Sequence, residues 1–366
     1  MIQGVLMNFL QKIGENIKLI FTWNPSDRLW QMPFFASVGV AIVLFVAAFF
    51  DRPDLGLVAI IGTNIFLYVP DTPIYHKMIL SMACAFGIVA SFTLGLVGQT
   101  YPSLIPLIVF LVTMVSAQVV RYFSIGAPGF FFFTFAMILG TYIPFEIKDY
   151  PAAIGLVALG TMVANIMVLL YSLSVIYIFK HPPKPIAKMG EFGFGVIIID
   201  PIIIAFFVSA SMIFQSFLEL ERGYWVGVSC AAILTAINFK QIWIKQLQRI
   251  LGTIVGVSFA YFLLHFSFNP IEFAFLMMLL MFFAELTTVR NYALAMVFLT
   301  PYSTYLAEVA SFMHYDPNLI IKARILDITI GSLFGLLGGA VMHWKPLREV
   351  LEKVAKKIIY KWIGAE

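Results

Sequence analysis

Two basic residues, Lys245 and Arg249, lie four positions apart near the start of a long apolar stretch. At that spacing they share one face of a helix, and an arginine can hold a carboxylate through two parallel hydrogen bonds. The small residues Gly252, Gly256 and Ser258 follow, and residues of this size let a second helix approach closely. The pattern predicts an anion-attracting site. The alternative is a pair of basic anchors whose charges reach the aqueous surface.

Other ionisable residues stand within or beside apolar stretches, where each charge requires a partner or a function. Arg121 and Arg290 occupy matching places in two similar halves of the chain and are candidates for anion binding or for anchoring. Glu285 is a candidate for proton coupling. Its spacing of five from Arg290 is poor for a pair within one helix, so we expect its partner on another helix. Arg324 and Asp327, three apart, favour a structural ion pair.

Uncharged polar and aromatic residues add weaker candidates. Asn64 and Asn238 can contact a substrate or form hydrogen bonds between helices, and the run Phe130–Phe133 favours packing or the lining of an aromatic path. Cys84 and Cys230 stand in apolar segments, which favours buried thiols. The sequence carries no nucleotide-binding loop, Cys/His metal cluster or catalytic motif. We therefore expect no enzymatic activity, metal, cofactor or nucleic-acid partner.

The composition requires a lipid environment. Apolar residues form 61% of the 366 residues and charged residues 11%, with a mean hydropathy of +0.95. A soluble domain has about 25% charged residues, so this chain cannot cover a water-facing surface of its own size. We expect an all-α, multi-pass integral membrane protein.

The apolar runs form two similar sets of six. They lie at 33–50, 55–70, 79–98, 103–120, 128–145, 152–178, 201–218, 224–239, 250–268, 271–288, 291–307 and 320–342. His76-Lys77 matches Lys245-Gln246 at a distance of 169 positions, and Gly87 matches Gly256 at the same distance. About twelve spans in two parallel six-helix repeats are therefore expected. The runs at 55–70 and 224–239 are short at matching places, which points to a binding site between the repeats.

The positive charges predict the orientation and the domain layout. With a cytoplasmic N-terminus, every Lys and Arg lies on the inside except Arg52, Lys148, Arg222, Lys322 and Arg324, as the positive-inside rule requires. Both termini are then cytoplasmic. The expected layout is an interfacial amphipathic segment at 1–32, repeats at 33–178 and 201–343, a Pro-rich cytoplasmic linker at 179–200, and a basic amphipathic helix at 344–366. Asp200-Pro201 favours a helix N-cap followed by a first-turn proline.

One stretch resembles a known family. Tyr224-Trp225, then Lys245, then Arg249-Ile-Leu-Gly252-Thr253 is similar to the fusaric acid resistance and aromatic acid exporter superfamily, which includes the aluminium-activated malate channels of plants. The stretch from Arg290-Asn291-Tyr292 to Thr300-Pro301 continues the likeness, which adds Tyr292 to the candidate site. The resemblance covers about 205–305 and is weaker over 33–175, where Gly56 and Leu80 stand in place of Trp225 and Arg249.

The resemblance implies a transporter of the cytoplasmic (inner) membrane that exports small organic anions, with aromatic carboxylates or related toxic acids as the expected class. It also implies a possible periplasmic adaptor (membrane fusion) protein as a partner. Basic residues on the inner side would gather the anion. Two alternatives stay open, a passive anion channel and a membrane scaffold that carries no flux.

The predicted topology can be tested by labelling introduced cysteines. Residues 146 and 308 should react with a membrane-impermeant thiol reagent from outside, and residue 184 only from inside. In the predicted topology an odd number of spans separates residues 146 and 308 from the cytoplasmic N-terminus, and an even number separates residue 184 from it. Labelling of residue 184 from outside would contradict the topology.

Overall fold

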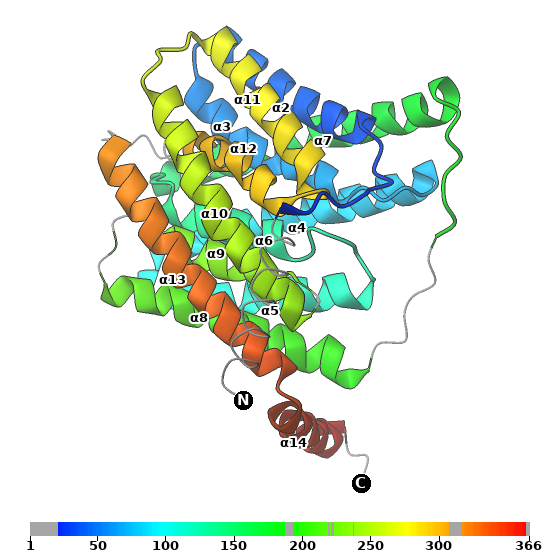
Figure 1. Ribbon diagram of the computed structural model, residues 1–366, viewed down its shortest axis with the longest axis vertical. Coiled ribbons are helices and arrows are strands. Elements are labelled where there is room, and N and C mark those ends of the chain that lie inside the picture. The colour runs from blue at the N-terminus through cyan, green and yellow to red at the C-terminus, as the bar shows by residue number, and fades with distance from the viewer. Residues whose placement is uncertain are drawn as a thin grey trace, which may run out of the picture.

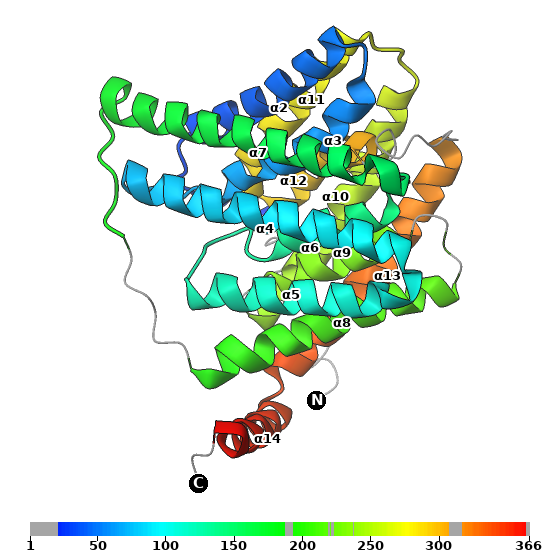
Figure 2. The same cartoon turned by 180° about the vertical axis from the view of Figure 1, so that it is seen from behind.

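The protein is all-helical in a computed structural model that describes residues 21–186, 193–218, 220, 223–236, 238–306 and 317–363. Figures 1 and 2 show two opposite views of the bundle, with the last helix projecting from one end. The first six helices are α2 (Gln31–Phe49), α3 (Pro53–Thr63) with the 3-10 turn η1 (Asn64–Tyr68), α4 (Ile74–Thr100), α5 (Ile105–Tyr122), α6 (Phe131–Tyr142) and α7 (Tyr150–Leu173). The next are α8 (Asp200–Phe217), α9 (Tyr224–Leu234), α10 (Phe239–Leu264), α11 (Pro270–Thr288), α12 (Tyr292–Thr304), α13 (Pro317–His343) and α14 (Lys345–Ile363).

Helix length follows the same order in both halves of the chain. Eight helices in the described ranges are long and apolar enough to cross a membrane: α2, α4, α5, α7, α8, α10, α11 and α13. The second and fifth helices of each half are short, with 11 residues in α3 and in α9, 12 in α6 and 13 in α12. The runs at 128–145 and 291–307 therefore do not form the full-length spans that we expected. Glycine, proline and polar residues at their ends limit the helical part.

Helix pairing also repeats. In the first half, α7 packs against α2, α3 and α4, and α6 packs against α4 and α5. In the second half, α13 packs against α8, α9 and α10, and α12 packs against α10 and α11. The contacts between the halves match as well, because α5 packs on α8 and α11 packs on α2. A duplicated six-helix unit would give this arrangement. The twelve-span count, the parallel repeat and the cytoplasmic termini stay predictions.

Polar caps set where several of the helices begin. Asn238 accepts a hydrogen bond from the Gln241 backbone N–H at 2.9 Å and starts α10, and Asn291 does the same for α12 through Leu294. Such caps satisfy backbone donors that the helix itself leaves open. Asp200 is not the N-cap that we predicted, since Ile199 holds that position without a side-chain cap and a π-helical turn at Gly195–Ile199 precedes α8. The Asp200 carboxylate is instead engaged by arginines.

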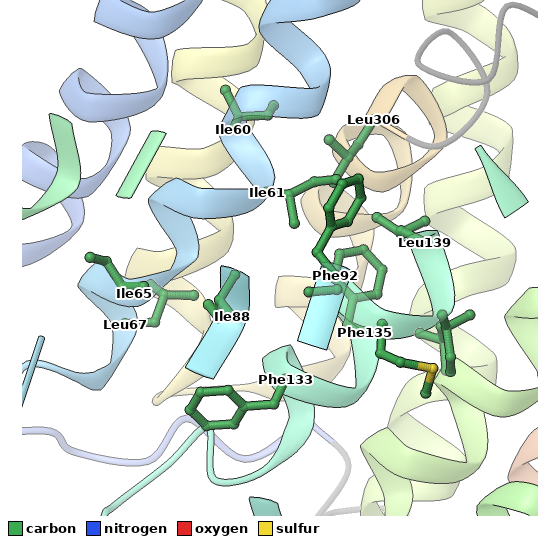
Figure 3. Close-up of a cluster of buried hydrophobic side chains, with 14 of the residues drawn as sticks. Ile60, Ile61, Ile65, Leu67, Ile88, Phe92, Phe133, Phe135, Leu139 and Leu306 are labelled. Atoms are coloured by element: carbon green, nitrogen blue, oxygen red, sulfur yellow. The ribbon is translucent and has the colours of Figure 1, made fainter. Parts of the chain in front are cut away.

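The short helices are buried between the long ones. Every residue of α9 is buried, and so are residues 56–63 of α3. Figure 3 shows the apolar cluster around α3 and η1, in which Ile61 lies beside Leu306 and Ile65 lies beside Leu67 and Ile88. Cys84 and Cys230 are buried free thiols, as predicted.

Two sequence expectations concern the ends of the chain. The basic C-terminal segment forms the helix α14, which confirms that part of the prediction. The expected N-terminal amphipathic helix falls on residues 1–32, of which 1–20 lie outside the described residues.

Glycine permits the close approach of α10 and α12. A Cβ at Gly256 would lie 2.7 Å from the Met296 carbonyl oxygen and 2.8 Å from the Thr300 Cβ. We expect Gly256→Ala to separate these helices and to lower stability by about 1–3 kcal/mol, the usual cost of overpacking. Thermal unfolding of the purified protein in detergent would measure the loss.

Gly155→Ala is the matched control, because nothing lies within 4 Å of a Cβ at that position of α7. It should leave the melting temperature unchanged or slightly raised, since alanine favours the helix. An equal loss in both variants would contradict the role given to the α10–α12 contact.

Candidate anion site in the central cavity

A cavity of about 1360 Å³ lies inside the bundle and receives residues from both halves. Its walls include the ends of helices that the charge pattern assigns to the cytoplasmic side, among them the end of α5, the start of α10 and the end of α13. Arg324 and His343 both line it. These residues of α13 are about 28 Å apart along the helix at 1.5 Å per residue. The cavity therefore extends along much of the length of α13.

Arg249 lies inside this cavity and is buried, with 5% of its surface exposed. Its Nη1 donates to the Tyr292 hydroxyl at 2.9 Å and its Nη2 donates to Ser229 Oγ at 3.2 Å. The Nε–H is buried with no hydrogen-bond partner among the described residues. The side chain does not reach the aqueous surface as a basic anchor would, because α9 and α12 enclose it. The guanidinium retains donor capacity for a ligand.

Lys245 and Tyr292 lie beside it and complete a small cluster. The half-buried Lys245 donates from Nζ to Thr235 Oγ1 at 2.5 Å, and the same Nζ is 4.9 Å from the centre of the Tyr292 ring. Tyr292 thus receives a hydrogen bond from Arg249 and a cation–π contact from Lys245. The structure brings Lys245, Arg249 and Tyr292 together. Lys245 and Arg249 lie on one face of α10, as their spacing predicted, and Tyr292 is the first residue of α12.

The acidic residues that line the cavity are engaged by other bases. Arg28 Nη2 pairs with Glu285 Oε2 at 2.9 Å, and Arg121 Nη1 pairs with Asp200 Oδ2 at 2.5 Å. Two weaker pairs join His181 to Asp71 at 3.2 Å and Lys184 to Asp27 at 3.6 Å. Within the described ranges, neither Lys245 nor Arg249 has an ion-pair partner closer than 4.0 Å. The cluster around Tyr292 is therefore a region of uncompensated positive charge.

Glu285 pairs with a residue far away in the chain, as its spacing predicted, but that residue lies before a helix and not on the helix that we expected. The carboxylate bonds to Arg28, which precedes α2, and not to Arg290 on its own segment. Arg28 was missed in the sequence because it stands in a polar segment before the first apolar run, where a basic residue is ordinary.

Arg121 faces the cavity, but its guanidinium belongs to a network at the seam between α5 and α8. Besides Asp200, it donates to the Val196 carbonyl at 3.0 Å. Arg348 of α14 reaches the second Asp200 oxygen at 3.4 Å and also bonds to Glu352 at 3.2 Å. Asp200 thereby joins α5, α8 and α14.

Three predicted site residues have other roles in the structure. Arg290 donates to the Leu286 carbonyl at 2.6 Å and lies 5.9 Å from the Trp23 ring, outside the cavity lining. Asn238 caps α10 and also lies outside that lining. Asn64 does line the cavity, and its amide donates to the Ile61 carbonyl at 3.0 Å. Whether any of the predicted residues binds a substrate stays a prediction.

Part of the cavity wall is aromatic. Phe131, Phe132 and Phe135 of α6 line the cavity, and the Phe135 ring centre lies 6.5 Å from that of Trp225 on α9. The sequence signal for this wall was the Phe-rich run, for which packing was the favoured interpretation. Ser229 carried no separate signal, since a serine within an apolar helix commonly bonds within its own helix.

Comparison with known proteins finds one family model and one relative that each match part of the chain. Residues 204–338 match the family model described as "Fusaric acid resistance protein-like". The chain is similar to the "Uncharacterized membrane protein YvaC" of Bacillus subtilis (strain 168), with 31% identity over 140 residues. These residues are 38% of this chain and 22% of that relative, so the match spans about a fifth of the relative's length. No solved structure matches the chain.

The Asp200 network predicts a measurable contribution to stability. We expect Asp200→Asn to lower the free energy of unfolding by about 1.5–3 kcal/mol, because two arginines lose a charged acceptor in a largely buried place. Chemical or thermal unfolding in detergent would measure the change.

Glu146→Gln is the matched control. Glu146 pairs with Lys148 at 2.7 Å, but both side chains are 72% exposed, so the loss should stay below about 1 kcal/mol. Equal effects of the two variants would contradict the structural role of Asp200.

Proposed function

We propose that this chain, a membrane protein of the fusaric acid resistance protein-like family, exports small organic anions from the cytoplasm. The family match over residues 204–338 supports a transport role. The protein lies in a lipid bilayer, and we propose that this bilayer is the cytoplasmic (inner) membrane. A periplasmic adaptor protein is part of the proposal as a possible partner.

The uncompensated charge of Lys245 and Arg249 is the observation that carries the proposal. A buried cation without a carboxylate partner is costly, so its retention inside a cavity suits the binding of an anion from solution. The guanidinium offers a planar set of donors for a carboxylate, with the Tyr292 hydroxyl beside it. The ammonium of Lys245 adds a second charge on the same face of α10. Together they would attract an anion and orient it.

The aromatic wall favours an aromatic carboxylate within the class of small anions. A ring placed between Phe131 or Phe135 and the basic cluster would bury its apolar face while its carboxylate met Arg249. Aromatic rings gain from edge-to-face and offset contacts in addition to their burial. An aliphatic anion of the same charge would lose this part of the contact.

Glu285 is the residue to which the proposal assigns proton coupling. Its carboxylate lines the cavity and holds Arg28. Protonation would remove the negative charge and break the ion pair with Arg28. Proton binding and anion binding would then be coupled through Arg28.

Flux through reconstituted protein tests the function. Liposomes that contain the purified protein should accumulate radiolabelled benzoate against its gradient when a proton gradient is imposed, after subtraction of the leak in protein-free liposomes. Rapid flux that ignores the proton gradient would favour a passive channel instead. No flux above the protein-free level would contradict both transport readings.

Arg249 supplies the sharpest test of the site. We expect Arg249→Gln to weaken benzoate binding about ten- to hundred-fold, because one desolvated charge-assisted contact is lost, worth about 1.5–3 kcal/mol. Arg249→Lys should recover only part, since the planar fork is lost. Isothermal titration in detergent would measure the affinities.

Arg52→Gln is the control, because Arg52 is exposed and pairs with Asp54 at 2.8 Å away from the cavity. It should bind benzoate as the unchanged protein does. Normal insertion of the Arg249→Gln protein with unchanged affinity would remove Arg249 from the site.

A further inference from the structure

The segment before α2, which we call the N-terminal strap (residues 21–30), forms part of the cavity wall. Figure 1 shows the strap in dark blue, running from the start of α2 to the turn between α11 and α12. It is exposed on its outer side at Phe21, Trp23 and Trp30. Five of its residues line the cavity: Thr22, Asn24, Asp27, Arg28 and Leu29. The strap therefore lies between the cavity and the surface of the bundle.

The end of the strap nearest α2 is held by packing. Leu29 packs against the hydrophobic core, and its carbonyl accepts a hydrogen bond from the Met32 backbone N–H at 3.1 Å. The Trp30 ring makes edge-to-face contacts with Phe34 and Phe179, with ring centres 6.1 and 6.3 Å apart. This end is continuous with α2 and is the natural hinge.

The other end of the strap is held by polar contacts. The backbone N–H and the side-chain amide of Asn24 both donate to the Arg290 carbonyl, at 2.9 and 3.1 Å. The Asn291 amide donates to the Thr22 carbonyl at 3.2 Å, and Arg28 pairs with Glu285 at 2.9 Å. Residues 22–29 form neither helix nor strand. A segment attached by a few polar contacts can open locally at a small part of the global unfolding free energy.

These polar contacts lie next to the basic cluster. Arg290 and Asn291, which hold the strap, directly precede Tyr292, whose hydroxyl accepts a hydrogen bond from Arg249. Displacement of the strap from this turn would open the cavity beside Arg249. The mouth formed in this way lies on the side that the charge pattern assigns to the cytoplasm.

The matching segment of the second half has no such freedom. The residues before α8 form the π-helical turn at Gly195–Ile199, which continues into that helix. Arg121 donates to the Val196 carbonyl within this turn and pairs with Asp200 of α8 itself. Release of these contacts would leave a helix in place. The first half alone has an extended segment at this position among the described residues.

We propose that the N-terminal strap is a gate, which rotates about Leu29 and Trp30 and must leave the α11–α12 turn before an organic anion can reach Arg249. Separation of Arg28 from Glu285 is part of the opening. This inference rests on the proposed function, because it names the entry step for the same anion.

A reversible cross-link across the gate tests the proposal. Cysteines replace Asn24 and Arg290 in a protein whose buried thiols are removed by Cys84→Ala and Cys230→Ala. A bis-methanethiosulfonate reagent with a short spacer then joins the two introduced thiols in detergent, before reconstitution into liposomes. We expect the flux of benzoate to fall to the level of protein-free liposomes and to return when dithiothreitol releases the link.

Spacer length provides the matched control. From Asn24 to Leu29 the strap spans at most about 20 Å when fully extended. A reagent of the same chemistry with a spacer of that length attaches to the same thiols but lets the strap move, so it should leave most of the flux. The protein with Asn24→Cys alone, treated with either reagent, should transport as it does untreated.

Access to the cavity gives a second measurement that needs no cross-link. Thr253 is buried and lines the cavity, so Thr253→Cys in the same background reports on entry of a small anionic thiol reagent. Adding Arg28→Gln should raise the labelling rate about tenfold, the factor by which loss of one charge-assisted contact shifts the balance of closed and open states. Adding Arg52→Gln, at an exposed ion pair, should leave the rate unchanged.

Three results would overturn the gate: undiminished flux with the short link in place, equal loss of flux with both spacers, or equal labelling of Thr253→Cys with and without Arg28→Gln. Failure of the proposed function looks different. In that case the reduced protein, with its strap free, would neither bind nor move benzoate.

Discussion

A positive charge held inside the bundle, with no carboxylate partner among the described residues, is the constraint on which the proposed site depends. Arg249 cannot lose its proton in a protein, so its desolvation must be offset by dipoles, by the cavity water or by an anion. Tyr292 and Ser229 supply two of these contacts, and their positions require α12 and α9 to approach α10 closely. Gly252 and Gly256 permit the approach of α12. The buried charge of Arg249 therefore depends on the short helices α9 and α12 and on the glycine contacts between α10 and α12.

The two halves share an architecture but divide the chemistry. Both have the same order of long and short helices and the same pairing, including the reciprocal seams α5–α8 and α11–α2. One ion pair occurs at each seam with its charges reversed: Arg121 of α5 holds Asp200 of α8, and Glu285 of α11 holds Arg28 before α2. The basic residues near α9 belong to the second half, and the phenylalanine wall belongs to the first. A cavity between unlike walls can orient a ligand with unlike ends.

Much of the fold and part of the site could be predicted from the sequence. The composition established a membrane protein, and the spacing of Lys245 and Arg249 placed them on one face, where the structure has them. The poor spacing of Glu285 and Arg290 correctly indicated a partner elsewhere. The lengths of α6 and α12 were overestimated, because an apolar run does not show where its backbone leaves the helix. Asp200 was taken for a cap, since Asp before Pro has that local meaning and its arginine partners come from distant segments.

What the sequence alone determined is local: apolar runs, helix caps, the charge pattern and the motif from Trp225 to Thr253 follow from neighbouring residues and their periodicity. Only the tertiary structure decided which charges are compensated. Arg28, Arg121 and Arg249 look alike as arginines beside or within apolar segments, yet their surroundings differ. The first two meet carboxylates, and Arg249 meets hydroxyls. The physical reason is that a charge is neutralised through space, by groups far away in the chain.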